Sequence, residues 1–190
     1  MVVMDDNTCM VGTAKFFLEF TADESCGKCP PCRVGTKILL DMLTDIAEGR
    51  GKEGDIETLE DLARDIIATS LCGLGQTAPN PILTTIRYFK DEYESHIKDK
   101  WCKAGVCRNL TTFWIDEELC KGCGACLRAC PSKAIVGEKK MPHKIIQELC
   151  IHCRTCYDAC KFKSIRILPA KFEGDPAELE AVSGTAKGEA

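Results

Sequence analysis

The sequence has few aromatic residues, no long apolar run and no excess of basic residues. Only 6% of its 190 residues are Phe, Trp or Tyr, and its formal net charge is −4. No stretch approaches the roughly 20 apolar residues that a membrane-spanning helix needs. The mixed, slightly acidic charge gives no basic footprint for nucleic acid. We therefore expect neither a nucleic-acid partner nor direct membrane contact.

The sequence also lacks a glycine-rich phosphate-binding loop of the Rossmann or P-loop type. No targeting segment is visible, so we expect a cytoplasmic location. At 190 residues there is room for one ordinary domain or two small ones. The abundant residue is cysteine, with 15 copies. This favours two small domains, because bound metal can stabilise segments that are too short to bury a large core.

Eight of the cysteines lie in two runs of the form C-x2-C-x2-C-x3-C. In such a run three thiolates hold one 4Fe-4S cluster, while the fourth ligates the neighbouring cluster. One predicted cluster has the ligands Cys120, Cys123, Cys126 and Cys160. The other has the ligands Cys130, Cys150, Cys153 and Cys156. Zinc ribbons are the alternative, but a zinc ion takes four ligands and would leave half of each run unused.

These runs resemble the bacterial two-cluster ferredoxin domain over residues 112–168. The sequence predicts short strands at residues 113–115, 134–136, 144–146 and 165–167, with helices after Cys126 and Cys156. His143 and His152 are expected to face solvent, because the predicted clusters already have full cysteine sets. An odd number of cysteines and the lack of a signal peptide argue against a disulfide framework.

Four segments before residue 98 place apolar residues at helical spacing, at residues 8–21, 34–48, 55–70 and 80–97. Their apolar stripes, including Phe16, Phe17, Phe20 and Phe89, predict the core of a small four-helix bundle. Residues 1–4 are β-like but have no strand nearby to pair with. The expected fold class is α+β, with the helical bundle first and the ferredoxin-like domain second.

Three cysteines in a Pro- and Gly-containing loop predict a further 4Fe-4S cluster. Cys26, Cys29 and Cys32 have the C-x2-C-x2-C spacing of three cluster ligands. Cys72, at the end of the third expected helix, is placed to supply the fourth. Three thiols at fixed spacing in such a loop are poor core material, so we expect ligands here.

Two stretches carry a resemblance to a known family. They are MVVMDDNTCMVGTAKFFLEFTADESCGKCPPCRVGT and SLCGLGQTAPNPILTTIRYFKDEYESHI, and the two ferredoxin runs follow them. With these stretches the chain resembles the C-terminal part of the NADH-oxidising flavoprotein subunit of respiratory complex I. The version that it resembles is the β subunit of electron-bifurcating hydrogenases and related NAD(P)-linked complexes.

The resemblance implies a helical domain whose 4Fe-4S cluster accepts electrons from flavin, followed by a mobile two-cluster ferredoxin domain. The implied partners are a hydrogenase-type catalytic subunit, a small 2Fe-2S subunit and ferredoxin. The family's flavin- and NADH-binding part should precede Met1 and is not in this sequence. FMN and NAD(P) are therefore expected only in a missing portion or in a partner.

Three cysteines remain after twelve are assigned to clusters, and one histidine lies near two of them in the sequence. Three thiolates and one imidazole make a closed tetrahedral zinc site, and the resemblance implies a zinc ion at a hinge. The expected zinc ligands are Cys9, His96, Cys102 and Cys107. The alternative is a buried apolar Cys9, with the other two cysteines as free thiols.

We therefore expect five parts: the end of a missing flavin domain (1–7), the bundle (8–98), a zinc-braced hinge (99–111), the ferredoxin domain (112–168) and a flexible tail (169–190). No acid–base or nucleophile constellation is present, so no catalytic residue is expected in this segment. The predicted function is electron transfer through three 4Fe-4S clusters. It would link a flavin site that oxidises NAD(P)H to a hydrogenase-type subunit or ferredoxin, within an electron-bifurcating oxidoreductase. The alternative is an iron–sulfur and zinc binding module, structural or redox-sensing, that docks onto a partner.

Overall fold

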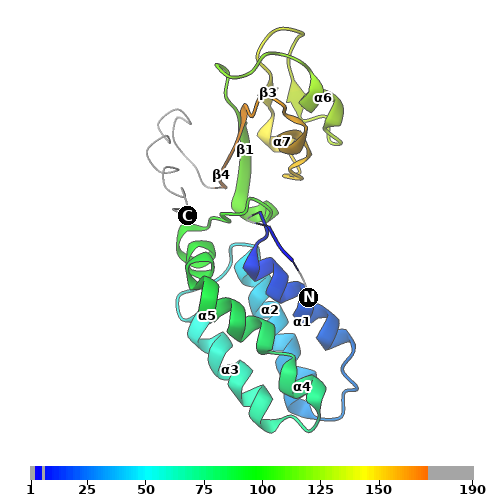
Figure 1. Cartoon of the computed structure of the whole chain (residues 1–190), viewed down its shortest axis with the longest axis vertical. Helices are drawn as coiled ribbons and strands as arrows, with labels where there is room; N and C mark the ends of the chain where they lie inside the picture. The colour runs from blue at the N-terminus through cyan, green and yellow to red at the C-terminus, as the bar shows by residue number, and fades with distance from the viewer. Residues whose placement is uncertain (1–2, 6, 171–190) are drawn as a thin grey trace. The chain divides into compact units, whose positions relative to one another are not determined.

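The computed structural model describes residues 3–5 and 7–170, and its contacts divide the chain into two compact units, Met1–Thr111 and Thr112–Ala190 (Figure 1). The remaining residues hold half of the expected N-terminal β-like run and nearly all of the expected tail, which lie outside the described residues. Val3 and Met4, the other half of that run, do not form a strand. Residues 99–111, the expected hinge, belong to the first unit.

The first unit consists mainly of helices. Its long helices are α1 (Met10–Asp23), α2 (Thr36–Ala47), α3 (Asp55–Thr69) and α5 (Asn80–Glu94). Shorter helices lie between or after them: η1 (Pro31–Gly35), α4 (Gly73–Thr77), η2 (Ser95–Asp99) and η3 (Arg108–Leu110). Pro81 lies in the first turn of α5, where its missing N–H leaves no helical hydrogen bond unmade. Gly54 has a φ of 92° directly before α3, a left-handed conformation that favours glycine.

The long helices pack around one apolar core. Helix α1 lies against α2 and α5, and α3 also contacts both of them. Leu18, Leu43, Leu59 and Ile82, one from each long helix, are completely buried. Burying such a side chain stabilises a fold by about 1.5–3 kcal/mol relative to leaving it exposed. Apolar burial therefore supplies a core to this unit independently of any bound group.

The predicted core face of α1 is wrong in part. Phe16 and Phe20 are 66% and 61% exposed, whereas Val11, Ala14 and Leu18 are completely buried. Helix α1 carries two apolar stripes on different sides, and the sequence does not say which of them meets the other helices. The stripe that packs against the other helices consists of Val11, Ala14 and Leu18, which are spaced by three and four residues.

A kink changes the predicted face of α5. The backbone of Phe89 is not helical, with φ −134° and ψ 37°, and this side chain is 41% exposed. Ile82 and Ile86 before the kink and Tyr93 after it remain buried. The predicted place of Phe89 in the core is therefore wrong, because the kink breaks the regular spacing on which that prediction depended.

The second unit combines short strands with single-turn helices. Its elements are β1 (Thr111–Ile115), α6 (Ala125–Ala129), β2 (Ile135–Val136), β3 (Lys144–Ile145), η4 (Gln147–Leu149), α7 (Thr155–Ala159) and β4 (Ile165–Pro169). Strand β1 pairs with β4, and β2 pairs with β3 in antiparallel register, Ile135 opposite Ile145. The strands lie close to where the sequence predicted them. Phe113, Ile115, Ile135 and Ile165 form the apolar core, next to cysteines from both runs.

Among residues 3–5 and 7–170, none of the helices combines the length and the apolar character that a membrane span requires.

Candidate metal centres

The first unit brings Cys9, His96, Cys102 and Cys107 together. One ligand atom from each lies within 4.8 Å of the others. The Nε2 atom of His96 is 3.4 Å from Sγ of Cys9 and 3.5 Å from Sγ of Cys107. Cys9, His96 and Cys102 are buried and Cys107 is partly buried. We call these four residues the Cys9 group.

Local structure positions each member of the Cys9 group. Cys9 is the N-cap of α1, and its sulfur accepts a hydrogen bond from the N–H of Gly12. His96 lies in η2, and its Nδ1 atom is 2.7 Å from the carbonyl oxygen of Glu92. Since that carbonyl can only accept, Nδ1 carries the proton and donates it. When the ring is neutral, as it must be to bind a metal ion, the lone pair of Nε2 therefore faces the thiols.

The electrostatics of the Cys9 group suit a cation. Burial disfavours a charged His96 ring, but hydrogen bonds with Cys102 and Cys9 outweigh it and raise the pKa of the ring to about 10. Hydrogen bonds from Cys107 and Cys9 lower the pKa of Cys102 well below its usual range. The pocket thus stabilises both a thiolate and a positive charge beside it. Three sulfurs and one imidazole nitrogen in this closed arrangement could hold a metal ion.

Glu92 connects the start of α1 to the Cys9 group. Its Oε2 accepts a hydrogen bond of 3.0 Å from the N–H of Met10, the first residue of α1. Its own carbonyl oxygen orients His96. Burial raises the pKa of the Glu92 carboxyl, while the hydrogen bond from Met10 opposes this shift. One residue thereby fixes the positions of two members of the group, Cys9 and His96.

The predicted ligands Cys26, Cys29, Cys32 and Cys72 come from two segments that meet. Cys29 and Cys32 are buried, whereas Cys26 and Cys72 are exposed. The N–H of Leu71 hydrogen-bonds the sulfur of Cys29 and lowers the pKa of that thiol. This contact places the segment that leads into Cys72 against the loop that carries the other three cysteines.

The close contact between Gly75 and Cys32 also places the Cys72 segment against the loop that carries the other three cysteines. A Cβ atom added to Gly75 would lie 3.1 Å from Cβ of Cys32 and 2.5 Å from Oγ of Ser70. Cys72 begins the turn that contains Gly75, since it is the N-cap of α4. Only a residue without a side chain lets that turn approach Cys32 so closely. The two segments are thus in contact, as they must be if their cysteines are to share one iron–sulfur group.

In the second unit the cysteines gather in two sets, each with members from both runs. Burial raises the pKa of Cys126, and the charges of Cys120, Cys123 and Cys160 raise it further. Burial raises the pKa of Cys156 to about 12, and its charged neighbours are Cys150, Cys153 and Cys130. The last cysteine of each run thus lies among the first three of the other, which is the arrangement that the spacing predicts.

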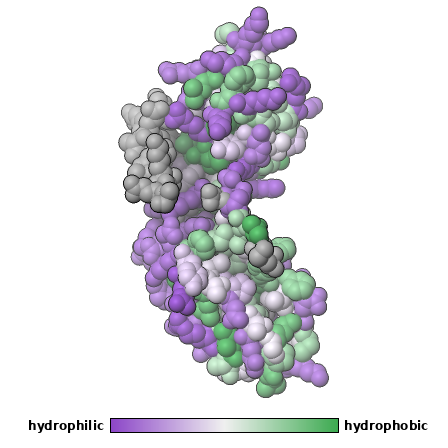
Figure 2. All heavy atoms as spheres, in the orientation of Figure 1, coloured by the Kyte–Doolittle hydropathy of each residue, from purple (hydrophilic) through white to green (hydrophobic). Residues whose placement is uncertain are grey.

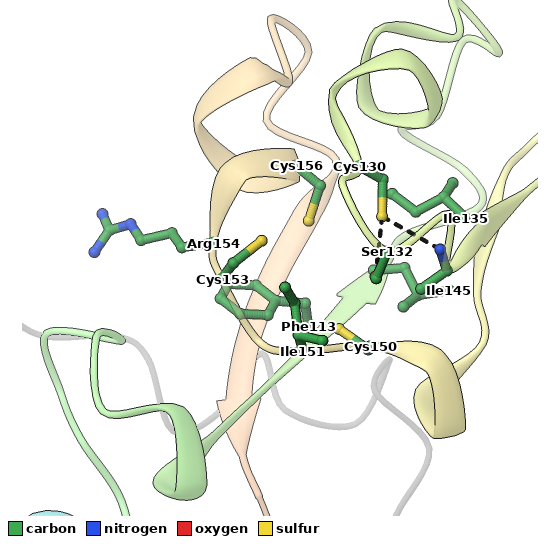
Figure 3. A pocket seen from close by; sticks show the side chains of 11 residues that line it. Phe113, Cys130, Ser132, Ile135, Ile145, Cys150, Ile151, Cys153, Arg154 and Cys156 are labelled. Atoms are coloured by element: carbon green, nitrogen blue, oxygen red, sulfur yellow. Dashed lines mark hydrogen bonds between the residues drawn. The ribbon is translucent and has the colours of Figure 1, made fainter.

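The set around Cys156 surrounds a small pocket (Figure 3). The sulfurs of Cys130, Cys150, Cys153 and Cys156 face the same space, and apolar side chains such as Phe113 close it. The N–H of Ala134 donates a hydrogen bond of 3.3 Å to Sγ of Cys130. Four thiols around an apolar space are suited to a 4Fe-4S cluster.

The prediction for His143 is wrong. Its side chain is only 2% exposed, and Nδ1 lies 3.9 Å from Sγ of Cys120. The backbone at Gly137 approaches the ring so closely that an added Cβ atom would lie 2.9 Å from it. Gly137 thereby covers the ring, which the polar sequence around His143 does not indicate. His152 is partly buried.

Sequence reasoning missed the hydroxyl groups that lie beside the cysteine sulfurs. Ser164 Oγ is 3.2 Å from Sγ of Cys160, and Thr155 Oγ1 is 3.3 Å from Sγ of Cys153. In the first unit, Ser25 Oγ is 3.3 Å from Sγ of Cys32. The only sequence signal is a Ser or Thr within a few residues of a ligand cysteine, and this is too common to be informative.

Both units are similar to segments of known proteins. Residues 12–96 match the family model described as the NADH-ubiquinone oxidoreductase-F iron-sulfur binding region, and residues 113–167 match the 4Fe-4S dicluster domain. The NADP-reducing hydrogenase subunit HndC of Solidesulfovibrio fructosivorans is 54% identical over 143 residues, which are 75% of this chain and 29% of that protein. The F subunit of NADH-quinone oxidoreductase from Streptomyces coelicolor is 42% identical over 113 residues, 60% of this chain and 25% of that protein.

The chain therefore spans less than a third of the length of these relatives. Among solved structures, an NAD⁺-reducing [NiFe]-hydrogenase in the H2-reduced state is similar to half of the chain. The match covers 50% of this chain and 16% of the hydrogenase chain, with 34% sequence identity and a TM-score of 0.48. By the two family models, residues 12–96 are similar to the iron–sulfur binding region of NADH-ubiquinone oxidoreductase-F proteins, and residues 113–167 are similar to 4Fe-4S dicluster domains.

Proposed function

We propose that this chain is an electron-transfer segment with three 4Fe-4S clusters and one zinc ion. Cys26, Cys29, Cys32 and Cys72 would hold one cluster at the end of a four-helix bundle. Cys120, Cys123, Cys126 and Cys160 would hold the second, and Cys130, Cys150, Cys153 and Cys156 the third. The clusters, when bound, supply one-electron transfer. The observation that carries the proposal is the exchange of Cys130 and Cys160 between the two runs.

The protein's own residues control the surroundings of each site. Phe113, Ile135 and Ile145 line the pocket around Cys156 and keep it largely apolar. Backbone N–H groups and hydroxyls donate to the sulfurs. Burial and hydrogen bonds of this kind set the reduction potential of an iron–sulfur group. This environment supports a role in electron transfer over a purely structural one.

The Cys9 group would hold the zinc ion. Its four donors match a closed structural site, with three thiolates and one imidazole. The contact of His96 with the carbonyl of Glu92 is the outer hydrogen bond that fixes such a ligand. Because the ligands come from both ends of the first unit, the ion would brace the segment that leads into the second.

The proposed partners are those that the family resemblance implies, and HndC is itself named as a subunit of an NADP-reducing hydrogenase. The chain would link a flavin site that oxidises NAD(P)H, in a longer polypeptide or a partner, to a hydrogenase-type subunit or ferredoxin. A small 2Fe-2S subunit would complete the complex. In the electron-bifurcating version, motion of the second unit about residues 99–111 would separate two electron routes. A cross-link across this segment should then abolish bifurcating turnover in the complex, and unchanged turnover would rule out gating.

The composition of the chain purified without oxygen tests the proposal directly. We expect about 12 iron, 12 acid-labile sulfide and one zinc per chain, with no flavin. Dithionite should bleach the chromophore reversibly, and a redox partner should then reoxidise it. About 8 iron or fewer with two or more zinc would show that one cysteine set binds zinc. The alternative of a binding module would then be favoured.

A further inference from the structure

Ser70 has a buried hydroxyl that finds no partner among the described residues. The residue is 5% exposed and its Oγ atom makes no hydrogen bond. Its backbone is fully used: the N–H donates to the carbonyl of Ile66 at 3.0 Å, and the carbonyl accepts from Nε2 of Gln76 at 3.0 Å. The hydroxyl is therefore the one polar group of Ser70 that lacks a hydrogen-bond partner among the described residues.

An unpartnered hydroxyl is unfavourable at a buried position. Removing it from water without a replacement hydrogen bond costs about 1–3 kcal/mol. Alanine would avoid this cost and would suit the end of α3 equally well. The hydroxyl is therefore expected to have a partner that is not part of the polypeptide.

The surroundings of Ser70 identify that partner. The nearest segments carry predicted ligands of the cluster on Cys26, Cys29, Cys32 and Cys72, which we call the first cluster. Both Cys32 and the Ser70 side chain lie close to Gly75. Leu71, the next residue, donates its N–H to the sulfur of Cys29. Cys72 follows directly. The hydroxyl thus lies beside the segments that carry Cys29, Cys32 and Cys72.

A second hydroxyl lies beside the same site. Ser25 Oγ accepts a hydrogen bond of 3.3 Å from the N–H of Gly27 and is 3.3 Å from Sγ of Cys32. With its oxygen accepting from Gly27, the Ser25 proton is available to the sulfur. Ser25 already has a protein partner for its proton, whereas Ser70 does not.

We propose that Ser70 donates a hydrogen bond to the iron–sulfur group held by Cys26, Cys29, Cys32 and Cys72, and that it raises the reduction potential of this group. The inference rests on the proposed function of that site. Reduction adds negative charge to the sulfurs, so a donated hydrogen bond stabilises the reduced form more than the oxidised form. Ser70 does not bind iron; its hydroxyl stabilises the negative charge that reduction adds to the sulfurs.

The test is a redox titration of the full chain, monitored by electron paramagnetic resonance, with dithionite as reductant. The signal of the first cluster is identified as the one that disappears in Cys32→Ala. Ser70→Ala should retain this signal but lower its midpoint potential. A tenfold fall in the equilibrium constant for reduction would appear as a shift of about 59 mV. Thr69→Val is the matched control, because that exposed hydroxyl bonds the carbonyl of Asp65 instead.

Ser70→Thr separates the hydroxyl from the volume of the side chain, because it keeps the donor. It should retain the wild-type potential. Loss of the cluster in Ser70→Ala, with a wild-type potential in Ser70→Thr, would also support the contact. An unchanged potential in Ser70→Ala, or an equal shift in both variants, would overturn it.

A second readout tests the contact without a potential. In D2O, pulsed resonance spectra of the first cluster should show an exchangeable proton that Ser70→Ala lacks. Identical spectra would overturn the inference. If no signal depends on Cys32 in the wild-type chain, the proposed cluster itself is absent, and this outcome is distinct from a failure of the Ser70 contact.

Discussion

At the scale of single residues, small polar and backbone groups decide what each cysteine set can hold. The carbonyl of Glu92 selects the tautomer of His96, and the N–H of Leu71 favours the thiolate of Cys29. Neither contact involves a side chain that a motif search would select. The cysteines supply the ligands, while these neighbours determine their charge and orientation.

Cys102→Ala should lower the zinc content from about one ion per chain to nearly none, since it removes one of four ligands from a closed site. Iron should remain unchanged, because the Cys9 group shares no ligand with the predicted clusters. Elemental analysis of the anaerobic protein measures both. Val106→Ala, a neighbouring exposed position, is the control and should retain its zinc. Full zinc in Cys102→Ala would refute the assignment.

Gly122→Ala should prevent assembly of the cluster on Cys120, Cys123, Cys126 and Cys160. Gly122 has a φ of 61°, and an added Cβ atom would lie 2.5 Å from the backbone nitrogen of Met141. The nearest atoms all belong to the backbone of Lys140 and Met141, which cannot move aside as a flexible side chain can. Iron content should fall by about four atoms per chain.

Gly73→Ala is the matched control for this change, because an added Cβ atom meets nothing within 4 Å there. It should leave the iron content as it is. Equal iron in the Gly122→Ala protein would contradict the steric argument.

At the scale of elements, the second unit depends on one ion pair between its terminal strands. Arg166 in β4 donates a hydrogen bond of 2.6 Å to Oδ2 of Asp116, which follows β1. Oδ1 of Asp116 accepts from the N–H groups of Glu118 and Leu119. The N–H of Asp116 donates to the carbonyl of Ser164. The end of β1, the start of β4 and the turn before Cys120 are thereby held together.

Asp116→Asn should destabilise the unit by about 1–2 kcal/mol, because it removes the charge but keeps an acceptor for the turn. Burial would raise the pKa of Asp116, but the hydrogen bonds from Arg166, Leu119 and Glu118 together outweigh it, so the pKa lies below its ordinary 3.8. The stabilisation from the ionised Asp116 carboxylate is fully present above pH 3.8, the ordinary pKa of this group. It is lost as the pH falls through the lower pKa of the folded state. Urea unfolding at neutral pH measures the difference.

Lys144→Gln breaks the exposed pair of Lys144 with Glu117 and serves as the control. An exposed pair of this kind contributes about 0–1 kcal/mol, so the variant should unfold nearly as the wild type does. Equal stability of Asp116→Asn and the wild type would show that the Asp116 contact is not stabilising.

The elements also show how much the sequence could predict. Helical spacing and cysteine spacing predicted the long helices, the short strands and the residues that gather as possible ligands. The outward side of Phe16 and the kink at Phe89 were not predictable, because they depend on how the helices contact one another. His143 was misjudged because Gly137, which covers it, carries no side chain. The donors to sulfur were missed because a hydroxyl near a cysteine becomes informative only through its distance.

At the scale of the whole molecule, the two units differ in charge. Residues 1–111 contain 13 Lys and Arg against 18 Asp and Glu. Residues 112–170 contain ten basic residues against six acidic ones, and residues 171–190 contain two against five. Figure 2 shows hydrophilic side chains over much of the visible face of the second unit. The positive surface that residues 112–170 provide attracts acidic proteins over distances comparable with the Debye length.

Electron exchange with a small acidic redox protein should therefore slow by about tenfold when salt rises from about 50 to about 500 mM, because salt screens the attraction. Stopped-flow absorbance of the reduced chain measures this rate. Reaction with a small uncharged mediator should vary little over the same range. A rate with the acidic protein that is independent of salt would show that the positive surface does not guide encounter.

The Cys9 group has a consequence for synthesis of the chain. Its members Cys9 and Cys107 are 98 residues apart, and their sulfurs are 3.7 Å from each other. During translation Cys9 leaves the ribosome before its co-ligands, and almost the entire first unit must follow before they emerge. A metal ion bound there closes a ring that contains every long helix, much as a cross-link would. Metal supply in the cell therefore acts at the last step of folding of this unit, and a shortage would leave a nascent chain with formed helices and an open ring.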